Sequence, residues 1–297
     1  MSEERAKLGE IELVYEQIGD RDDVPLLLVM GLGMQLIHWD LEFCEMLAER
    51  GYRVIRFDNR DSGLSTKIAA PVPPVLRAMA GMRIDAPYLL SDMAADSFGL
   101  LDHLGIESAH VMGVSMGGMI AQVMALDRPE RVRSLTSIMS TTGNRRAGMP
   151  RLRAFALLLR RAPADRDAYI SYFVKTFQVI GSPAYREDEA RMRETAAATY
   201  DRSHHPAGTV RQLAATLASG DRTTRLRELH VPTAVVHGTD DPLIPLRAGV
   251  ATARAIPDAE LVAIPGMGHD LPHQVWPKVV AAFEANAARA AEPARVS

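Results

Sequence analysis

The chain has one cysteine and little net charge, and both facts exclude classes of function. Cys44 is the only cysteine, so an intrachain disulfide and a cysteine-based metal site are excluded. With 34 basic and 37 acidic residues the formal net charge is -3, which gives no electrostatic footprint for nucleic acid or for an anionic membrane. The partner expected from this balance is a small molecule without strong charge.

Long apolar runs are also missing. No window approaches the length of a membrane span, and the first seven residues are charged and lack the apolar stretch of a secretory signal. We therefore expect a cytoplasmic protein that does not enter a membrane, as a monomer or a homodimer. Cys44 lies between Phe43 and Met46 in a helical pattern, which predicts a core residue rather than a nucleophile.

Short runs rich in valine and isoleucine alternate along the chain with longer amphipathic stretches. This alternation predicts β-α units and a mostly parallel sheet. A β-hairpin is predicted at 10–18, where apolar and polar residues alternate. Strands are expected at 26–30, 54–57, 111–114, 135–138, 233–237 and 261–264, and helices at about 39–50, 92–104, 116–127, 247–255 and 273–287.

Residues 141–222 interrupt the alternation. They contain no good strand and are rich in Arg, Ala, Leu and Met at helical spacing, which predicts a helical cap over the carboxyl ends of the strands. The chain would then consist of a core domain, residues 1–140 and 223–297, and a cap, residues 141–222. Side chains of the cap that could form pocket walls, or could simply hold its helices on the core, are Leu157, Phe173, Phe177, Met192 and Tyr200.

The most informative segment surrounds Ser115, which lies between Gly113 and Gly117 where an apolar run changes to a helical pattern. A strand that turns sharply into a helix at a serine strains the backbone and exposes the hydroxyl, and the flanking glycines avoid a collision across the turn. The following helix directs backbone N–H groups at the same point. A glycine-rich turn with an unreactive serine has the same pattern. Whether Ser115 is a nucleophile therefore depends on whether the rest of the sequence supplies a base and an acid to work with it.

A serine hydroxyl is a weak nucleophile at neutral pH and needs a base, which a third group must orient. Two later strands are each followed by a loop that supplies such a group. Asp240 and Asp241 follow the first of these strands, and His269 follows the second. The order serine, aspartate, histidine is that of the α/β-hydrolase triad.

With these pieces the chain resembles an α/β-hydrolase over nearly its whole length. The resemblance implies an α/β-hydrolase fold with a mostly parallel eight-stranded sheet, flanked by helices, and the cap inserted after the sixth strand. Within that superfamily the chain is most similar to small bacterial carboxylesterases and to the aclacinomycin methylesterase type. The matching segments are 28–33, 57–65, 88–96, 113–117, 238–242 and 265–269; the family's usual His-Gly start of the first segment is Met30-Gly31 here.

The resemblance also assigns roles. The family spacing selects Asp241 over Asp240 as the acid, which would orient His269 as the base for Ser115. The backbone N–H groups of Leu32 and Met116 would form an oxyanion hole. Further substrate contacts are expected from Gly31, Phe177 and Tyr88, while Asp58 and Arg60 would shape the turn after their strand.

The expected function is hydrolysis of carboxylic esters through an acyl-enzyme, on short to medium acyl esters or on a methyl ester of a small metabolite. No metal or organic cofactor is needed for this chemistry. Other functions on the same triad are an enol-lactonase or a cofactor-independent perhydrolase or haloperoxidase. A hydrolase-like ligand receptor and a catalytically inactive binding module are alternatives from a different class.

Overall fold

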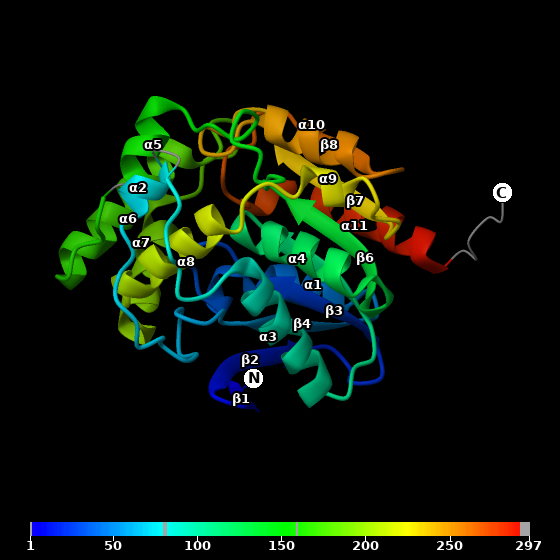
Figure 1. Cartoon of the computed structure of the whole chain (residues 1–297). Coiled ribbons are helices and arrows are strands. Elements are labelled where there is room, and N and C mark those ends of the chain that lie inside the picture. The colour runs from blue at the N-terminus through cyan, green and yellow to red at the C-terminus, as the bar shows by residue number, and fades with distance from the viewer. Residues whose placement is uncertain (1, 80–81, 159, 292–297) are drawn as a thin grey trace.

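The computed structural model describes residues 2–79, 82–158 and 160–291, which form an eight-stranded sheet with helices on both faces (Figure 1). The strand order is β1-β2-β4-β3-β5-β6-β7-β8. β2 is antiparallel to both β1 and β4, and all other neighbours are parallel. The strands are β1 (Glu4–Leu8), β2 (Ile11–Ile18), β3 (Val24–Val29), β4 (Tyr52–Phe57), β5 (Ala109–Val114), β6 (Val132–Ile138), β7 (Thr233–Gly238) and β8 (Glu260–Ile264).

The predicted mostly parallel sheet is confirmed, and two apolar clusters fix the helices to it. One cluster joins the sheet to α3, α4 and α10, and the other joins the opposite face to α1 and α11. The helices of these layers are α1 (Leu41–Ala48), α3 (Leu90–His103), α4 (Met116–Asp127), α10 (Leu246–Ala255) and α11 (Trp276–Ala291). Short helical turns are η1 (Leu36–His38), α2 (Val75–Met79), η2 (Pro129–Arg131), α9 (Thr223–Leu226) and η3 (His273–Val275).

The predicted hairpin is displaced in the structure. Residues 11–18 form one continuous strand, β2, and its antiparallel partner is β1, with Gly9 at a φ of 68° in the turn between them. β1 is an edge strand in which Ala6 alone is buried, so its exposed charged residues hide the alternation that identifies a half-buried strand.

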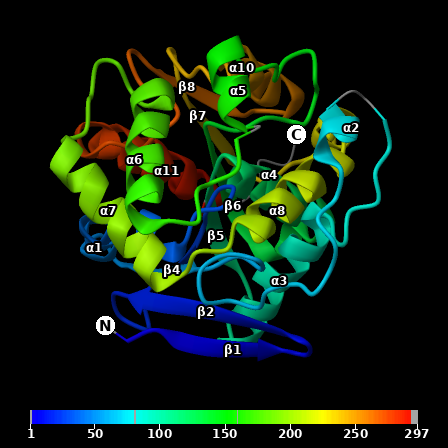
Figure 2. The ribbon, with the colours of Figure 1, turned by 90° about the vertical axis from the view of Figure 1, so that its left-hand side faces the viewer.

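Between β6 and β7 lie four longer helices, which we call the helical segment: α5 (Leu152–Leu158), α6 (Arg166–Ile180), α7 (Glu189–Arg202) and α8 (Pro206–Ala218). They lie together at one end of the sheet (Figure 2), the end toward which β6 and β7 point in Figure 1. The carboxyl ends of the parallel strands thus lie beside them.

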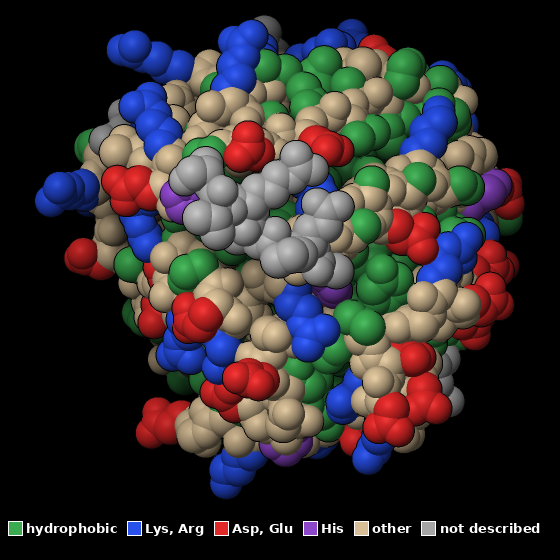
Figure 3. All heavy atoms as spheres, turned by 90° about the vertical axis from the view of Figure 1, so that its right-hand side faces the viewer, with side chains coloured by type: hydrophobic (Ala, Val, Ile, Leu, Met, Phe, Trp, Pro, Cys, Tyr) green, Lys and Arg blue, Asp and Glu red, His purple; other side chains and the backbone are tan. Residues whose placement is uncertain are grey.

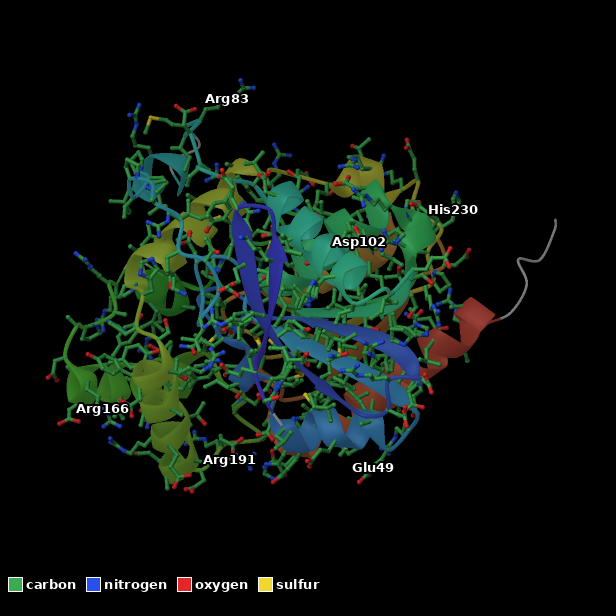
Figure 4. All side chains as sticks on the ribbon, turned by 90° about the horizontal axis from the view of Figure 1, so that it is seen from below. Glu49, Arg83, Asp102, Arg166, Arg191 and His230 are labelled. Atoms are coloured by element: carbon green, nitrogen blue, oxygen red, sulfur yellow. The ribbon has the colours of Figure 1, made fainter. Side chains whose placement is uncertain are left out.

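Arginines of the helical segment pair with aspartates near the strand ends. Arg202 of α7 contacts Asp58 at 2.7 Å, and Arg211 of α8 contacts Asp61 at 2.7 Å. Farther out, Arg191 pairs with Asp40 at the start of α1. Figure 4 shows Arg191 on this side of the molecule, together with Arg166, which pairs with Asp201 between α6 and α7.

The face away from the helical segment is shown in Figure 3, where basic and acidic side chains are interspersed. No helix within residues 2–79, 82–158 and 160–291 is long and apolar enough to cross a membrane.

Candidate active site

Ser115 occupies the tight turn between β5 and α4. Its backbone has φ 54° and ψ -119°, a region that non-glycine residues adopt rarely and at a cost in energy. A Cβ at Gly113 would lie 2.2 Å from the carbonyl oxygen of Gly117, and a Cβ at Gly117 would lie 2.0 Å from that of Val29. The structure therefore explains both glycines of the motif.

The serine hydroxyl lies at the start of a chain of three polar side chains. Oγ of Ser115 is 3.0 Å from Nε2 of His269, and Nδ1 of the same imidazole is 2.7 Å from Oδ2 of Asp241. Asp241 is 1% exposed and His269 8%. Both contacts lie within hydrogen-bonding distance, so the arrangement can pass a proton from the hydroxyl to the imidazole and hold the resulting positive charge beside a carboxylate.

Asp241 is held by its own loop as well. Its Oδ1 accepts hydrogen bonds from the backbone N–H groups of Leu243 and Ile244, each at 2.8 Å, so the carboxylate cannot rotate away from the imidazole without losing both. The side chain of Asp240 instead accepts a hydrogen bond from the hydroxyl of Thr239. Of the two adjacent aspartates, the structure brings Asp241 to His269.

A second histidine lies behind this group. His237 is fully buried at the end of β7, with Nε2 2.7 Å from the carbonyl oxygen of Ile244 and 3.6 Å from Oδ2 of Asp241. Burial lowers its pKa, so the imidazole is neutral at neutral pH. It acts as a packing and hydrogen-bonding partner of the Asp241 loop.

The loop after β3 runs beside Ser115. A Cβ at Gly31 would lie 3.3 Å from Cβ of Ser115, so the backbone that follows, including Leu32, passes close to the hydroxyl. In the part of the chain that the structure describes, the backbone N–H groups of Leu32 and Met116 donate to no other group. They are thus available to an oxygen atom bound next to Ser115.

A cavity of about 990 Å³ opens at Ser115 and extends between the core and the helical segment. Gly31, Leu32, Met116 and His269 belong to its lining, as do many residues of α5, α6 and α8. Of the side chains that the sequence suggested as pocket walls, Leu157, Phe173 and Phe177 line the cavity. Met192 and Tyr200 do not; the hydroxyl of Tyr200 donates to the backbone of Ala164.

The expected substrate contact of Tyr88 is not supported by its position. Tyr88 is 3% exposed and is not among the lining residues; its hydroxyl donates to Oδ2 of Asp61 at 2.7 Å. Asp61 lines the cavity and also accepts two hydrogen bonds from Arg211, at 2.7 and 2.8 Å. Tyr88 thus holds the lining residue Asp61 in place without itself reaching the cavity. This contact joins residues that are distant in sequence.

Several lining residues were not expected from the sequence. His204 and His205 both line the cavity; Nε2 of His205 is 2.9 Å from the Arg211 guanidinium, and the centroids of the His204 and Tyr200 rings are 4.7 Å apart. His38 lies beside Phe173 in the same wall, and burial lowers its pKa to about 4. His38 has no motif around it that could have indicated this position.

The loop that carries His269 is fastened to the end of α6. The backbone N–H of His269 donates to the carbonyl oxygen of Ile180 at 2.7 Å, and that of Gly268 donates to the hydroxyl of Ser182 at 2.8 Å. The same hydroxyl donates to Asp270, next to His269. One helix of the segment that covers the cavity therefore also positions the histidine loop.

Comparison with known proteins identifies the family. The alpha/beta hydrolase fold family matches residues 24–274. The chain belongs to this family. It is 29% identical to the rhodomycin D methylesterase DauP of Streptomyces sp. (strain C5), over 92% of this chain and 94% of the relative. It is 30% identical to the putative carbamate hydrolase RutD of Azorhizobium caulinodans, over 88% of this chain and 89% of the relative.

Solved structures show the same fold. A thermophilic esterase from Thermogutta terrifontis superimposes with a TM-score of 0.71 at 24% identity, covering 96% of this chain and 99% of that one. A putative lipase from Acinetobacter baumannii AYE gives a TM-score of 0.76 at 17% identity, covering 98% and 92% of the two chains. The predicted fold class is therefore confirmed, and the comparisons support a hydrolase active on esters.

Proposed function

We propose that the chain is a serine hydrolase of carboxylic esters with Ser115 as nucleophile, His269 as base and Asp241 as the group that orients His269. The observation that carries the proposal is the continuous contact from Oγ of Ser115 through the imidazole to the buried carboxylate, at 3.0 and 2.7 Å. The strained turn at Ser115 supports it, because strain of this kind is retained where the position of a side chain matters.

Each step uses groups of this chain and water. Ser115 attacks the ester carbonyl while His269 takes the hydroxyl proton, and His269 then returns that proton to the leaving alcohol. Water next attacks the acyl-enzyme with the same histidine as base, releasing the acid and restoring Ser115. The N–H groups of Leu32 and Met116 would stabilise the oxyanion of each tetrahedral intermediate, each by about 3 kcal/mol.

The helical segment would act as a cap that selects the substrate. Phe173 and Phe177 of α6 lie with ring centroids 4.6 Å apart in the cavity lining, and they supply an apolar wall for the acyl or the alcohol part. The core, residues 1–140 and 223–297, would then supply the catalytic residues. The cap, residues 141–222, would determine which substrates bind. The partner is a small-molecule ester.

The names of the relatives limit the range of candidate ester substrates. Two of them are named rhodomycin D methylesterases, and each aligns over 92% of this chain. We therefore favour a methyl ester of a small metabolite as the natural substrate, with short to medium acyl esters as assay substrates. A relative named 3-oxoadipate enol-lactonase, 26% identical, keeps a lactone, which is a cyclic ester, as the second candidate.

The test compares wild type with Ser115→Ala on p-nitrophenyl butyrate, on a panel of methyl esters and on lactones. Ser115→Ala should lower kcat by about a million-fold, since the triad acts as a unit, with an unchanged circular dichroism spectrum. Multiple turnovers by the wild type exclude a receptor that reacts once. Retention of a tenth of the activity by the variant would contradict the assignment of Ser115, and peroxide-dependent halogenation faster than hydrolysis would favour a perhydrolase.

A further inference from the structure

The cavity meets solvent at a rim rich in arginine. Among the residues that the structure describes, its lining is mostly buried or half-buried, and the exposed lining residues come from two stretches, 145–161 and 220–221. Exposed lining residues mark the part of a cavity that reaches the surface. We call them the cavity rim: Arg145, Arg146, Met149, Arg160, Arg161, Gly220 and Asp221.

The charge of this rim is strongly positive. It holds four arginines and one carboxylate, that of Asp221. Of the two other aspartates in the lining, Asp61 is buried and paired with Arg211, and Asp270 lies deeper, beside His269. Neither of them offsets the charge of the rim.

Three of the rim arginines have no carboxylate partner. Arg146, Arg160 and Arg161 form no ion pair within the described residues. Elsewhere in the helical segment, Arg166, Arg191, Arg202 and Arg211 each contact an aspartate at hydrogen-bonding distance. These three arginines thus lie without an ion pair where a ligand would enter, although the whole chain carries a net charge of -3.

We propose that this site, as an ester hydrolase, takes esters that carry a second, anionic group at the end remote from the scissile bond, a carboxylate or a phosphate, which the rim arginines bind. Guanidinium groups suit both anions, because their planar donors match the oxygens in pairs. With Ser115 at the inner end and the rim at the outer end, such an ester would span the cavity. The expectation from net charge, a substrate without strong charge, would then be wrong, because a local group of arginines outweighs the chain total.

The inference rests on the proposed function, and its test measures charge preference. The substrates are mono-p-nitrophenyl suberate, its terminal-amide isostere and the analogue that ends in phosphate. For the wild type, kcat/KM should be about ten-fold higher for the anions than for the amide at low salt, and the ratio should approach one at about 0.5 M salt, where exposed charges are screened. The larger of the two anion ratios identifies the preferred group.

Variants locate the effect. Arg160→Gln with Arg161→Gln should reduce the anion preference by about five-fold and leave kcat/KM for the amide unchanged, which also shows that the variant is folded. Arg254→Gln is the control: it removes an exposed arginine of α10 that does not line the cavity and has no ion pair among the described residues. Its anion preference should equal that of the wild type.

Two failures are distinguishable. Hydrolysis of the amide and of the anions at equal rates, or a preference that survives the loss of Arg146, Arg160 and Arg161 together, would overturn this inference and leave the ester hydrolase intact. If none of the three substrates were hydrolysed, the result would count against the proposed function. Titration calorimetry with suberate then tests the rim without turnover: the double variant should bind it more weakly, and equal binding would overturn the inference.

Discussion

At the scale of single residues, two adjacent aspartates near the site, Asp240 and Asp241, have different surroundings. Asp241 is buried and holds three hydrogen-bonding contacts, one of them with His269. Asp240 is half-buried and bonds to Thr239. Although the two residues are adjacent, the loop brings Asp241, and not Asp240, to His269.

This difference gives the first prediction. Asp241→Asn should lower kcat on an activated ester by about ten-thousand-fold, because an amide stabilises the wrong tautomer of His269 and cannot balance its charge. Asp240→Asn, the matched control, should change kcat by less than about three-fold. Steady-state kinetics with p-nitrophenyl butyrate checks both, and the reverse ranking would show that Asp240 orients the histidine.

A second residue-scale prediction concerns His110 in β5. It is 5% exposed, and burial lowers its pKa to about 4, against about 6.5 in an unfolded chain. Between these values the unfolded chain binds a proton that the folded chain does not, so this contribution to stability is present above pH 6.5 and is lost as the pH falls toward 4.

His110→Gln should therefore make the free energy of unfolding less dependent on pH in that window, by up to about 1.4 kcal/mol per pH unit. Urea titrations of both proteins at several pH values measure the slope, which a constant packing loss does not alter. Parallel curves would contradict the assignment of acid sensitivity to His110.

At the scale of elements, the sequence predicted best where the pattern is local. The helix at 116–127 coincides with α4, and the strand expected at 111–114 lies within β5, because both apolar periodicity and the glycines are visible in one short segment. The first strand was missed because an exposed edge strand has little pattern. The bonds between Ser182 and the His269 loop join residues far apart in sequence, so no spacing could indicate them.

Those bonds predict that α6 positions the base. Ser182→Ala removes the hydroxyl that accepts from Gly268 and donates to Asp270, and it should lower kcat about ten-fold with KM nearly unchanged, because a small displacement of His269 misaligns proton transfer. Ser171→Ala, within α6 and away from this loop, is the control. A fall in stability without a change in kcat would show that Ser182 only holds the fold.

At the scale of the whole molecule, the helical segment is attached to the core through ion pairs of unequal burial. The side chains of Arg211 and Asp61 are 4% and 0% exposed, whereas those of Arg191 and Asp40 are 38% and 32% exposed. The residues of the candidate site could be predicted from sequence motifs. The ion pairs that attach the helical segment could not, because an isolated arginine in the sequence does not indicate which aspartate it will contact.

The two pairs should differ in their effect on stability. Arg211→Gln leaves the buried carboxylate of Asp61 without its cation and should lower the free energy of unfolding by about 3 to 5 kcal/mol. Arg191→Gln should cost less than about 1 kcal/mol, because its pair is largely solvated. Urea unfolding of both variants measures the difference, and equal losses would show that burial does not decide the strength of these attachments.

The central claim is that Ser115 forms an acyl-enzyme with the help of His269. Mass spectrometry of the protein after rapid mixing with p-nitrophenyl butyrate and acid quench tests this most directly. One butyryl group should appear on the peptide that contains Ser115, and it should be absent from Ser115→Ala and strongly reduced in His269→Ala. Full hydrolytic turnover with an acyl group on another residue, or with the adduct undiminished in His269→Ala, would contradict the account.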